Sequence, residues 1–353
     1  MIRKKEYIKS LQGLRFVLFL DIFLFHVLGI LNARSTFGSW FEYSGRLGVA
    51  GFLILSGFLF ALSSDSKKEL STISFEMNFF KKYYFYHFLL FVIFMPFEII
   101  RVFNGTQNIE NFLIKVLLQS TLTQSLIPRS DFYLSFNVVS WYLSTLMLIM
   151  LFSISIFKVL KKNNNLTIKK YLLLLLLFEF VLSLLLPESE FVTWLLYISA
   201  PVRLIDYTIG MCLGILYVRK DVRFKEQYKN FEIFAVILGL LILPFVNSYI
   251  PQNLTYSAIY TVLMGLLILL LADGDNYFNT LLSSKVLSKM GDISFYLYIS
   301  HYAVIKYIWL LWKRLPFVNN NLIWNIIFIS FTFFITCAIS KAFLFLREGK
   351  KNG

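Results

Sequence analysis

Arg15 and His26 are the ionisable residues whose types and spacing most suggest chemistry, because both fall inside one apolar run at residues 11–32. In a helix, eleven steps of about 100° return His26 to within roughly 20° of Arg15, about 16 Å further along the same face. Arg grips phosphate or carboxylate through a planar fork, and His exchanges protons near neutral pH. The pair predicts an anionic, elongated substrate held at Arg15 and reacting at His26. The alternative is that Arg15 extends to lipid headgroups while His26 hydrogen-bonds a neighbouring helix.

The elements that must position this pair are membrane helices. Of the 353 residues 58% are hydrophobic and 15% charged, and the mean hydropathy is +0.69, which excludes an ordinary soluble domain. The composition predicts an all-α polytopic transmembrane bundle, forming a single domain over residues 1–353. Ten apolar runs are each long enough to span a bilayer: residues 11–32, 44–63, 83–103, 137–158, 171–187, 200–218, 231–248, 255–272, 293–312 and 322–345.

The positive charges set the predicted topology. The net charge is +14, but the Lys and Arg residues cluster between apolar runs, which is typical of membrane topology rather than nucleic-acid binding. With ten spans and both termini cytoplasmic, most of the 34 Lys and Arg residues face the cytoplasm. An eleventh run, residues 109–127, carries Lys115 and several Ser, Thr and Gln residues. Full crossing there would place the basic loops on different sides, so we expect a re-entrant or interfacial segment.

Other polar residues inside the runs are weaker candidates. Arg203 and Asp206 are three residues apart, a spacing that favours a helix ion pair over substrate binding. Ser56 suggests a nucleophile, but a close helix contact through small residues is the favoured interpretation. The three histidines, His26, His87 and His301, lack metal-ligand spacing, so we expect no metal.

Five motifs occur in order along the chain. They are LQGLRFVLFLDIFLFHV (residues 11–27), GRLGVAGFLILSGFLF (45–60), SWYLSTL (140–146), APVRLIDYTIGMCLG (200–214) and LSKMGDISFYLYISHY (287–302). With these motifs the chain resembles the acyltransferase 3 family of integral-membrane acyltransferases. The resemblance implies transfer of an acyl group, most often acetyl from acetyl-CoA, to a hydroxyl of a cell-envelope glycan. It also implies a bacterial inner-membrane location.

The resemblance assigns roles to residues of this sequence. His26 would be the catalytic residue, acting as a general base or as a transient acyl carrier, and Arg15 would hold the donor. Lys81 and Lys82 stand where relatives carry arginines and are candidates for the CoA phosphates, although ordinary cytoplasmic-loop charges explain them equally well. Ser56, Trp141, Arg203, Asp206 and His301 are candidates for the cavity or the acceptor site. Where many members carry an acidic residue, this chain has Leu146, so no carboxylate role carries over.

The sequence therefore predicts a membrane O-acyltransferase that uses acetyl-CoA as co-substrate and binds no cofactor. Its expected partners are the lipid bilayer, an acyl-CoA donor, a glycan acceptor and envelope glycan-assembly proteins, with no nucleic acid. No appended extracytoplasmic domain is expected, because the chain ends at Gly353. One alternative is a transporter of a lipid-linked glycan or small solute, with Arg15 and Asp21 on its path. Another is a membrane sensor or scaffold without catalysis.

Overall fold

Every regular element in the described part of the chain is helical. The computed structural model describes residues 8–34, 40–65, 72–222, 224–246, 249–274, 276–315 and 322–352. The long helices are α1 (Lys9–Ile30), α3 (Trp40–Asp65), α4 (Thr72–Phe103), α7 (Ser140–Lys162), α8 (Asn165–Leu185), α10 (Ala200–Val218), α11 (Lys229–Val246), α12 (Ala258–Ala272), α15 (Ser294–Trp312) and α16 (Leu322–Asn352). Shorter elements are α5 (Ile109–Ser120), η1 (Gln124–Leu126), α6 (Ser130–Tyr133), α9 (Glu190–Thr193), η2 (Trp194–Ile198), η3 (Glu226–Tyr228), η5 (Gln252–Tyr256), α13 (Tyr277–Leu282) and α14 (Lys285–Asp292).

Eight helical segments of the described residues are long and apolar enough to cross a membrane. They coincide with eight of the ten predicted spans. The other two predicted spans are also helical, as α8 and α15, but they are not among these eight segments. Helix α8 contains Lys169, Lys170 and Glu179, while α15 carries several Tyr and Ser residues and a histidine. The structure thus supports an all-helical membrane bundle; ten crossings and cytoplasmic termini stay predictions.

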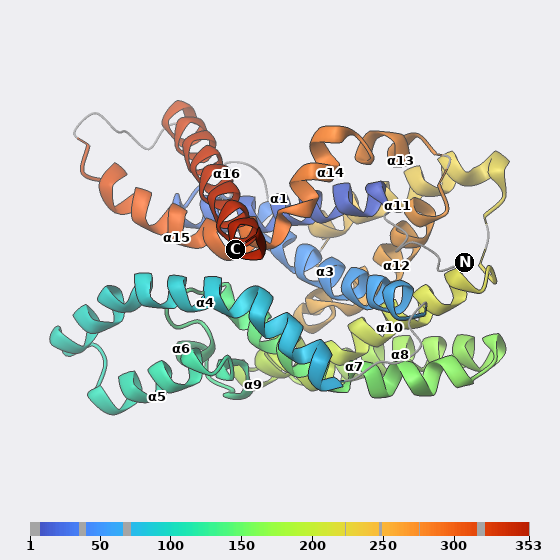
Figure 1. Ribbon diagram of the computed structural model, residues 1–353, viewed down its shortest axis with the longest axis horizontal. Coiled ribbons are helices and arrows are strands. Elements are labelled where there is room, and N and C mark those ends of the chain that lie inside the picture. The colour runs from blue at the N-terminus through green and yellow to red at the C-terminus, as the bar shows by residue number, and fades with distance from the viewer. Residues whose placement is uncertain are drawn as a thin grey trace.

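Close packing of α1, α3 and α10 forms the centre of the bundle (Figure 1). Glycines make this packing possible, because a Cβ at Gly57 would collide with the Tyr207 carbonyl and one at Gly210 with the Ile54 carbonyl. The backbones of α3 and α10 therefore lie in direct contact, as in other membrane helix pairs that pack through small residues. Gly57 belongs to the Leu-Ser-Gly-Phe motif and Gly210 to the motif at residues 200–214, so both motifs have a packing function.

Two of these eight long apolar segments are not continuous α-helices. The π-helical turn η2 ends at Ile198, and Ser199 separates it from α10; the 3₁₀ turn η5 ends at Tyr256, and Ser257 separates it from α12. Irregular backbone at membrane depth is tolerated only where protein or a polar cavity satisfies it. The side chains around these two interruptions include two of the predicted site residues, Arg203 and Asp206.

The segment at residues 109–127 does not cross the bundle as one helix. Helix α5 has 12 residues, too few for the roughly 20 that a crossing requires. Asn108 caps its first turn by accepting a hydrogen bond from the Asn111 backbone N–H. The chain then turns at Leu122, which is buried and has a φ of 55°, and continues into η1 and α6.

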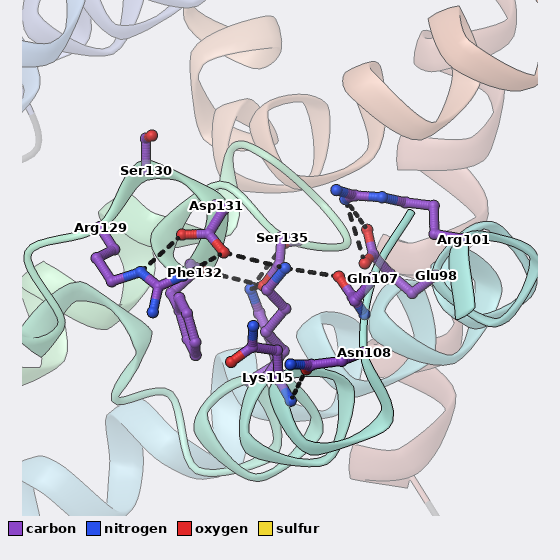
Figure 2. A network of polar contacts seen from close by, with 12 residues as sticks. Glu98, Arg101, Gln107, Asn108, Lys115, Arg129, Ser130, Asp131, Phe132 and Ser135 are labelled. Atoms are coloured by element: carbon purple, nitrogen blue, oxygen red, sulfur yellow. Dashed lines mark hydrogen bonds and ion pairs between the residues drawn. The ribbon is translucent and has the colours of Figure 1, made fainter. Parts of the chain in front are cut away.

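A buried lysine ties α5 to its neighbours (Figure 2). The Lys115 side chain is 2% exposed; its Nζ donates to Gln107 Oε1 at 2.6 Å and lies 3.5 Å from Asp131 Oδ2. Arg129 also pairs with Asp131, at 3.1 Å. Burial lowers the pKa of the Lys115 amine from its usual value, and the Asp131 carboxylate opposes this change. The charge of Lys115 argued against a membrane span at residues 109–127, and in the structure this side chain holds α5 against α6.

Candidate active site

Helix α1 places Arg15 and His26 against different neighbours at different depths. Arg15 Nη1 donates to Gln12 Oε1 at 3.2 Å, and the guanidinium lies near enough to Tyr142 of α7 to interact electrostatically with its hydroxyl. His26 is half-buried, and its ring contacts α15, lying 5.4 Å from the Tyr302 ring by centroids. Arg15 thus lies toward Tyr142 of α7, and His26 lies toward α15.

His301 lies directly beside His26, as the sequence interpretation allowed. Their ring centroids are 5.3 Å apart, and the planes are tilted by 47°. His301 is completely buried, with the rings of Phe19 and Phe23 packed at 5.7 and 6.3 Å. Two imidazoles from opposite ends of the sequence thus meet between α1 and α15, which gives this point of the bundle two groups capable of proton transfer.

The turn that precedes α7 clamps α15 next to His301. Asn137 Nδ2 donates to the Ile299 carbonyl at 2.9 Å, and the Tyr298 hydroxyl donates to the Val139 carbonyl at 2.8 Å. Phe136 has a φ of 55°, a left-handed conformation that is costly for a bulky residue and persists only where the surroundings enforce it. We infer that this turn is built to hold α15 in place, a function that no sequence motif indicated.

A row of aromatic rings runs from His301 across the bundle. Tyr298 lies 5.5 Å from Tyr142, Tyr142 6.1 Å from Trp141, and Trp141 5.1 Å from Tyr197, by ring centroids. Tyr197 in turn lies 5.5 Å from Tyr256. The predicted residue Trp141 therefore belongs to a continuous aromatic path between the histidine pair and the interrupted helices.

At the far end of this row, Arg203 and Asp206 form the ion pair that their spacing predicted, but inside the bundle rather than on a helix surface. Arg203 Nη1 lies 2.8 Å from Asp206 Oδ2, and both side chains are 1% exposed. A second guanidinium nitrogen donates to the Leu196 carbonyl, in the π-helical turn η2. The pair thus satisfies the interrupted backbone in front of α10.

Glu179 of α8 joins this network, and sequence reasoning missed it. Thr261 Oγ1 lies 3.2 Å from Asp206 Oδ1 and 3.4 Å from Glu179 Oε2, and Ser257 Oγ also donates to Asp206. Glu179 is 3% exposed. The available signal was a carboxylate inside the leucine-rich run at residues 171–187, since charged groups at membrane depth need a partner. The structure brings Arg203, Asp206 and Glu179 together but does not place them beside His26.

The remaining predicted residues lie on α3 and α4. The Ser56 hydroxyl donates to the Phe52 carbonyl of its own helix at 2.6 Å and lies within reach of the Tyr142 hydroxyl. Lys81 is exposed near the start of α4, and the Lys82 side chain lies outside the described part of the structure. Tyr83, the next residue, packs on Phe295 at 4.1 Å. This contact brings the first part of α4 to the beginning of α15.

No group of three or more His, Cys, Asp or Glu side chains that could hold a metal ion occurs among the described residues. The groups around the His26 ring include the His301 imidazole, the Tyr302 ring and the Arg34 guanidinium. Such groups suit proton transfer and nucleophilic attack.

Comparison with known proteins identifies the family. The acyltransferase 3 family, described as an acyltransferase domain, matches residues 8–341. Acyltransferase MdmB of Streptomyces mycarofaciens is 26% identical over 320 residues, which cover 84% of this chain and 79% of that protein. No solved structure matches the chain. The protein is an acyltransferase with membrane-spanning helices, and the chain belongs to the acyltransferase 3 family.

Proposed function

We propose that the protein transfers an acetyl group from cytoplasmic acetyl-CoA to a hydroxyl of a cell-envelope polysaccharide or lipid-linked glycan, in the bacterial inner membrane. The observation that carries this proposal is the position of His26. It is a half-buried imidazole in a membrane helix that also carries Arg15, and it contacts a second imidazole. Membership of the family indicates the type of reaction, acyl transfer, and the His26 imidazole is a group that can take part in it.

The donor end of the site is assigned to Arg15, Lys81 and Lys82. Arg15 offers a guanidinium fork for CoA phosphates, whereas lysines bind phosphate as point charges. In a continuous helix, Arg15 and His26 lie about 16 Å apart along the axis. An elongated donor with its phosphates near Arg15 would extend its thioester toward His26.

His26 has two chemically complete roles. As a general base it would take the proton of the acceptor hydroxyl while the hydroxyl oxygen attacks the thioester carbon and the C–S bond breaks. As an acyl carrier it would attack the thioester carbon itself, release CoA thiolate, and then yield the acetyl group to the hydroxyl oxygen. Both routes end with an acetyl ester, free CoA and a regenerated imidazole.

Acceptor binding is assigned to Ser56, Trp141, Arg203, Asp206 and His301. Trp141 supports this assignment best, because the aromatic row through Tyr142 and Tyr298 connects it to the histidine pair. Flat apolar rings with polar hydroxyls suit the mixed surface of a sugar. In a cell, the lipid bilayer and proteins that assemble envelope glycans would be the partners of such an enzyme.

The test compares the wild type with His26→Ala in the native host, by measuring alkali-labile acetate in purified envelope glycan. His87→Gln is the matched control, because it replaces a buried histidine that bonds the Gln119 carbonyl of α5. Immunoblots of membranes check that all three proteins accumulate equally. We expect acetate to be lost only in His26→Ala. Equal acetate in all three strains would contradict acetyl transfer and favour transport of a glycan or solute.

A further inference from the structure

We propose that His301 is a second catalytic residue, whose Nε2 removes the proton from the acceptor hydroxyl as that oxygen attacks the acyl carbon. His26 would then serve the donor. This inference rests on the proposed function, and it divides the two halves of the reaction between two histidines of α1 and α15.

The hydrogen-bond pattern of His301 fixes its tautomer. Nδ1 lies 2.6 Å from the Tyr298 carbonyl oxygen of its own helix. A carbonyl oxygen only accepts, so Nδ1 must carry the hydrogen and donate. In the neutral ring, Nε2 therefore has no hydrogen and presents a lone pair, the form that a general base requires.

The Nε2 atom of His301 is also buried and without a hydrogen-bond partner among the described residues. Buried polar atoms are nearly always paired, so an unpaired one requires an explanation. The surrounding rings of Phe19 and Phe23 offer none, since they have no polar atoms. A substrate hydroxyl that donates to Nε2 would supply the missing partner.

His87 shows that an unpaired nitrogen alone assigns nothing. It is 1% exposed, its Nε2 lies 2.8 Å from the Gln119 carbonyl, and its Nδ1 has no partner among the described residues. By the same reasoning His87 carries its hydrogen on Nε2, which makes it a cross-helix donor from α4 to α5. What distinguishes His301 is the second imidazole 5.3 Å away.

The clamp on α15 gives His301 the fixed position that a base needs. The carbonyl that orients the ring belongs to Tyr298, whose hydroxyl is bonded to Val139, and Asn137 holds the Ile299 carbonyl. Catalytic groups lose much of their effect when misplaced by about 1 Å. The turn before α7 is therefore a positioning element for His301.

Bonds, electrons and protons are all accounted for when His26 serves the donor and His301 serves the acceptor. The acyl carbon, on CoA or on a His26 ring nitrogen, is attacked by the acceptor oxygen, and the O–H proton passes to His301 Nε2. The C–S or C–N bond breaks, and its electrons return to the CoA sulfur or to the His26 nitrogen. His301 then releases its proton to the leaving thiolate or to water, and both rings are restored.

The experiment uses two acceptors that differ in their need for a base. The purified full-length protein receives labelled acetyl-CoA with either alkali-deacetylated envelope glycan from the native host or hydroxylamine. Hydroxylamine is a strong neutral nucleophile, so it captures the acetyl group as acetohydroxamate without prior removal of a proton. The variants are His26→Ala, His301→Gln, His301→Ala and the matched control His87→Gln, with thermal unfolding measured for each.

We expect His301→Gln to lose glycan acetylation by about 100-fold or more, the usual contribution of general base catalysis. It should keep acetohydroxamate formation above the uncatalysed reaction of hydroxylamine with acetyl-CoA. His26→Ala should lose glycan acetylation and fall to that uncatalysed level of acetohydroxamate. Added imidazole should restore glycan acetylation in His301→Ala and not in His26→Ala. His87→Gln should keep both reactions, because the Gln amide can still donate to the Gln119 carbonyl.

Two results would overturn the assignment. One is glycan acetylation by folded His301→Gln at the wild-type rate. The other is an equal loss of both products in His301→Gln with no imidazole rescue of His301→Ala, which would show that His301 acts only through His26. Failure of the proposed function is distinguishable from both, because the wild type itself would then form neither product above the His26→Ala level.

Discussion

Two groups of ionisable side chains lie inside the bundle, and they are held in opposite ways. The His26 and His301 rings contact mainly other rings, and His301 keeps an unpaired nitrogen. Around Arg203, in contrast, Asp206 accepts hydrogen bonds from the guanidinium and from two hydroxyls. The first group has bonding capacity left for a substrate, whereas the second uses most of its capacity on the protein.

The comparison separates chemistry from support. A buried ion pair is strongly destabilising to break, because the remaining charge has no water to solvate it. His26 is half-buried and contacts mainly other rings, so its removal leaves no buried charge behind. We therefore expect substitutions around Arg203 to reduce stability first, and substitutions of His26 to reduce activity alone.

Arg203→Leu should have the largest effect on stability. It leaves the Asp206 and Glu179 carboxylates buried without a cation, at a cost of about 3–5 kcal/mol. Thermal unfolding of the purified protein measures this loss, with His26→Gln as the contrasting variant that should unfold near the wild-type temperature. Equal unfolding temperatures for wild type and Arg203→Leu would remove the distinction between the two regions.

Arg15→Gln should change donor binding rather than folding. Loss of a charge-assisted contact to a phosphate costs roughly 1.5–3 kcal/mol, which corresponds to an increase of about 10-fold to 100-fold in the KM for acetyl-CoA. The matched control is Lys285→Gln, which removes one positive charge from an exposed position on α14. A KM that rises equally in both variants would indicate general electrostatics and no specific phosphate contact.

Glu179→Gln should leave the stability of the protein nearly unchanged, in contrast to a change at Asp206 in the same network. Glu179 accepts a hydrogen bond from Thr261 beside the Asp206 carboxylate. Making Glu179 neutral removes a like-charge interaction at little cost, within about 1 kcal/mol. Asp206→Asn should be much more destabilising, because Asp206 is the direct partner of Arg203. If the two variants unfold at the same temperature, Glu179 is as essential an acceptor as Asp206.

Lys115→Met should have the smallest effect, visible as a change in pH dependence. The folded protein lowers the pKa of Lys115 below its usual 10.5 by burial, so between the lowered value and 10.5 the unfolded chain binds more protons. The free energy of unfolding should therefore increase as the pH rises from the lowered pKa to 10.5. The slope of unfolding temperature against pH there should be smaller in Lys115→Met; an unchanged slope would show that burial does not affect the lysine.

Local spacing predicted the parts of this molecule that lie within single helices. Arg15 with His26, and Arg203 with Asp206, were found because helical periodicity and the cost of membrane charge apply to one segment at a time. The structure contains the Arg203 ion pair and places His26 at a polar contact between helices.

Contacts between distant segments left no comparable signal. Glu179 of α8 meets Asp206 of α10 beside Thr261 of a third helix, and Asn137 reaches the Ile299 carbonyl from a turn. The helical turns before Ser199 and Ser257 were also not predicted, because the expected spans begin only at residues 200 and 255. Backbone geometry and tertiary packing decide these features, and hydropathy does not report them.

The most direct test of the central claim is transfer of labelled acetyl from acetyl-CoA to alkali-deacetylated envelope glycan in a single turnover, by purified wild type and His26→Gln. Thermal unfolding of the same samples controls for folding. We predict that the wild type forms an alkali-labile acetyl ester, and that the variant forms none above background while unfolding at the wild-type temperature. Ester formation by His26→Gln at the wild-type rate would contradict catalysis at the histidine pair.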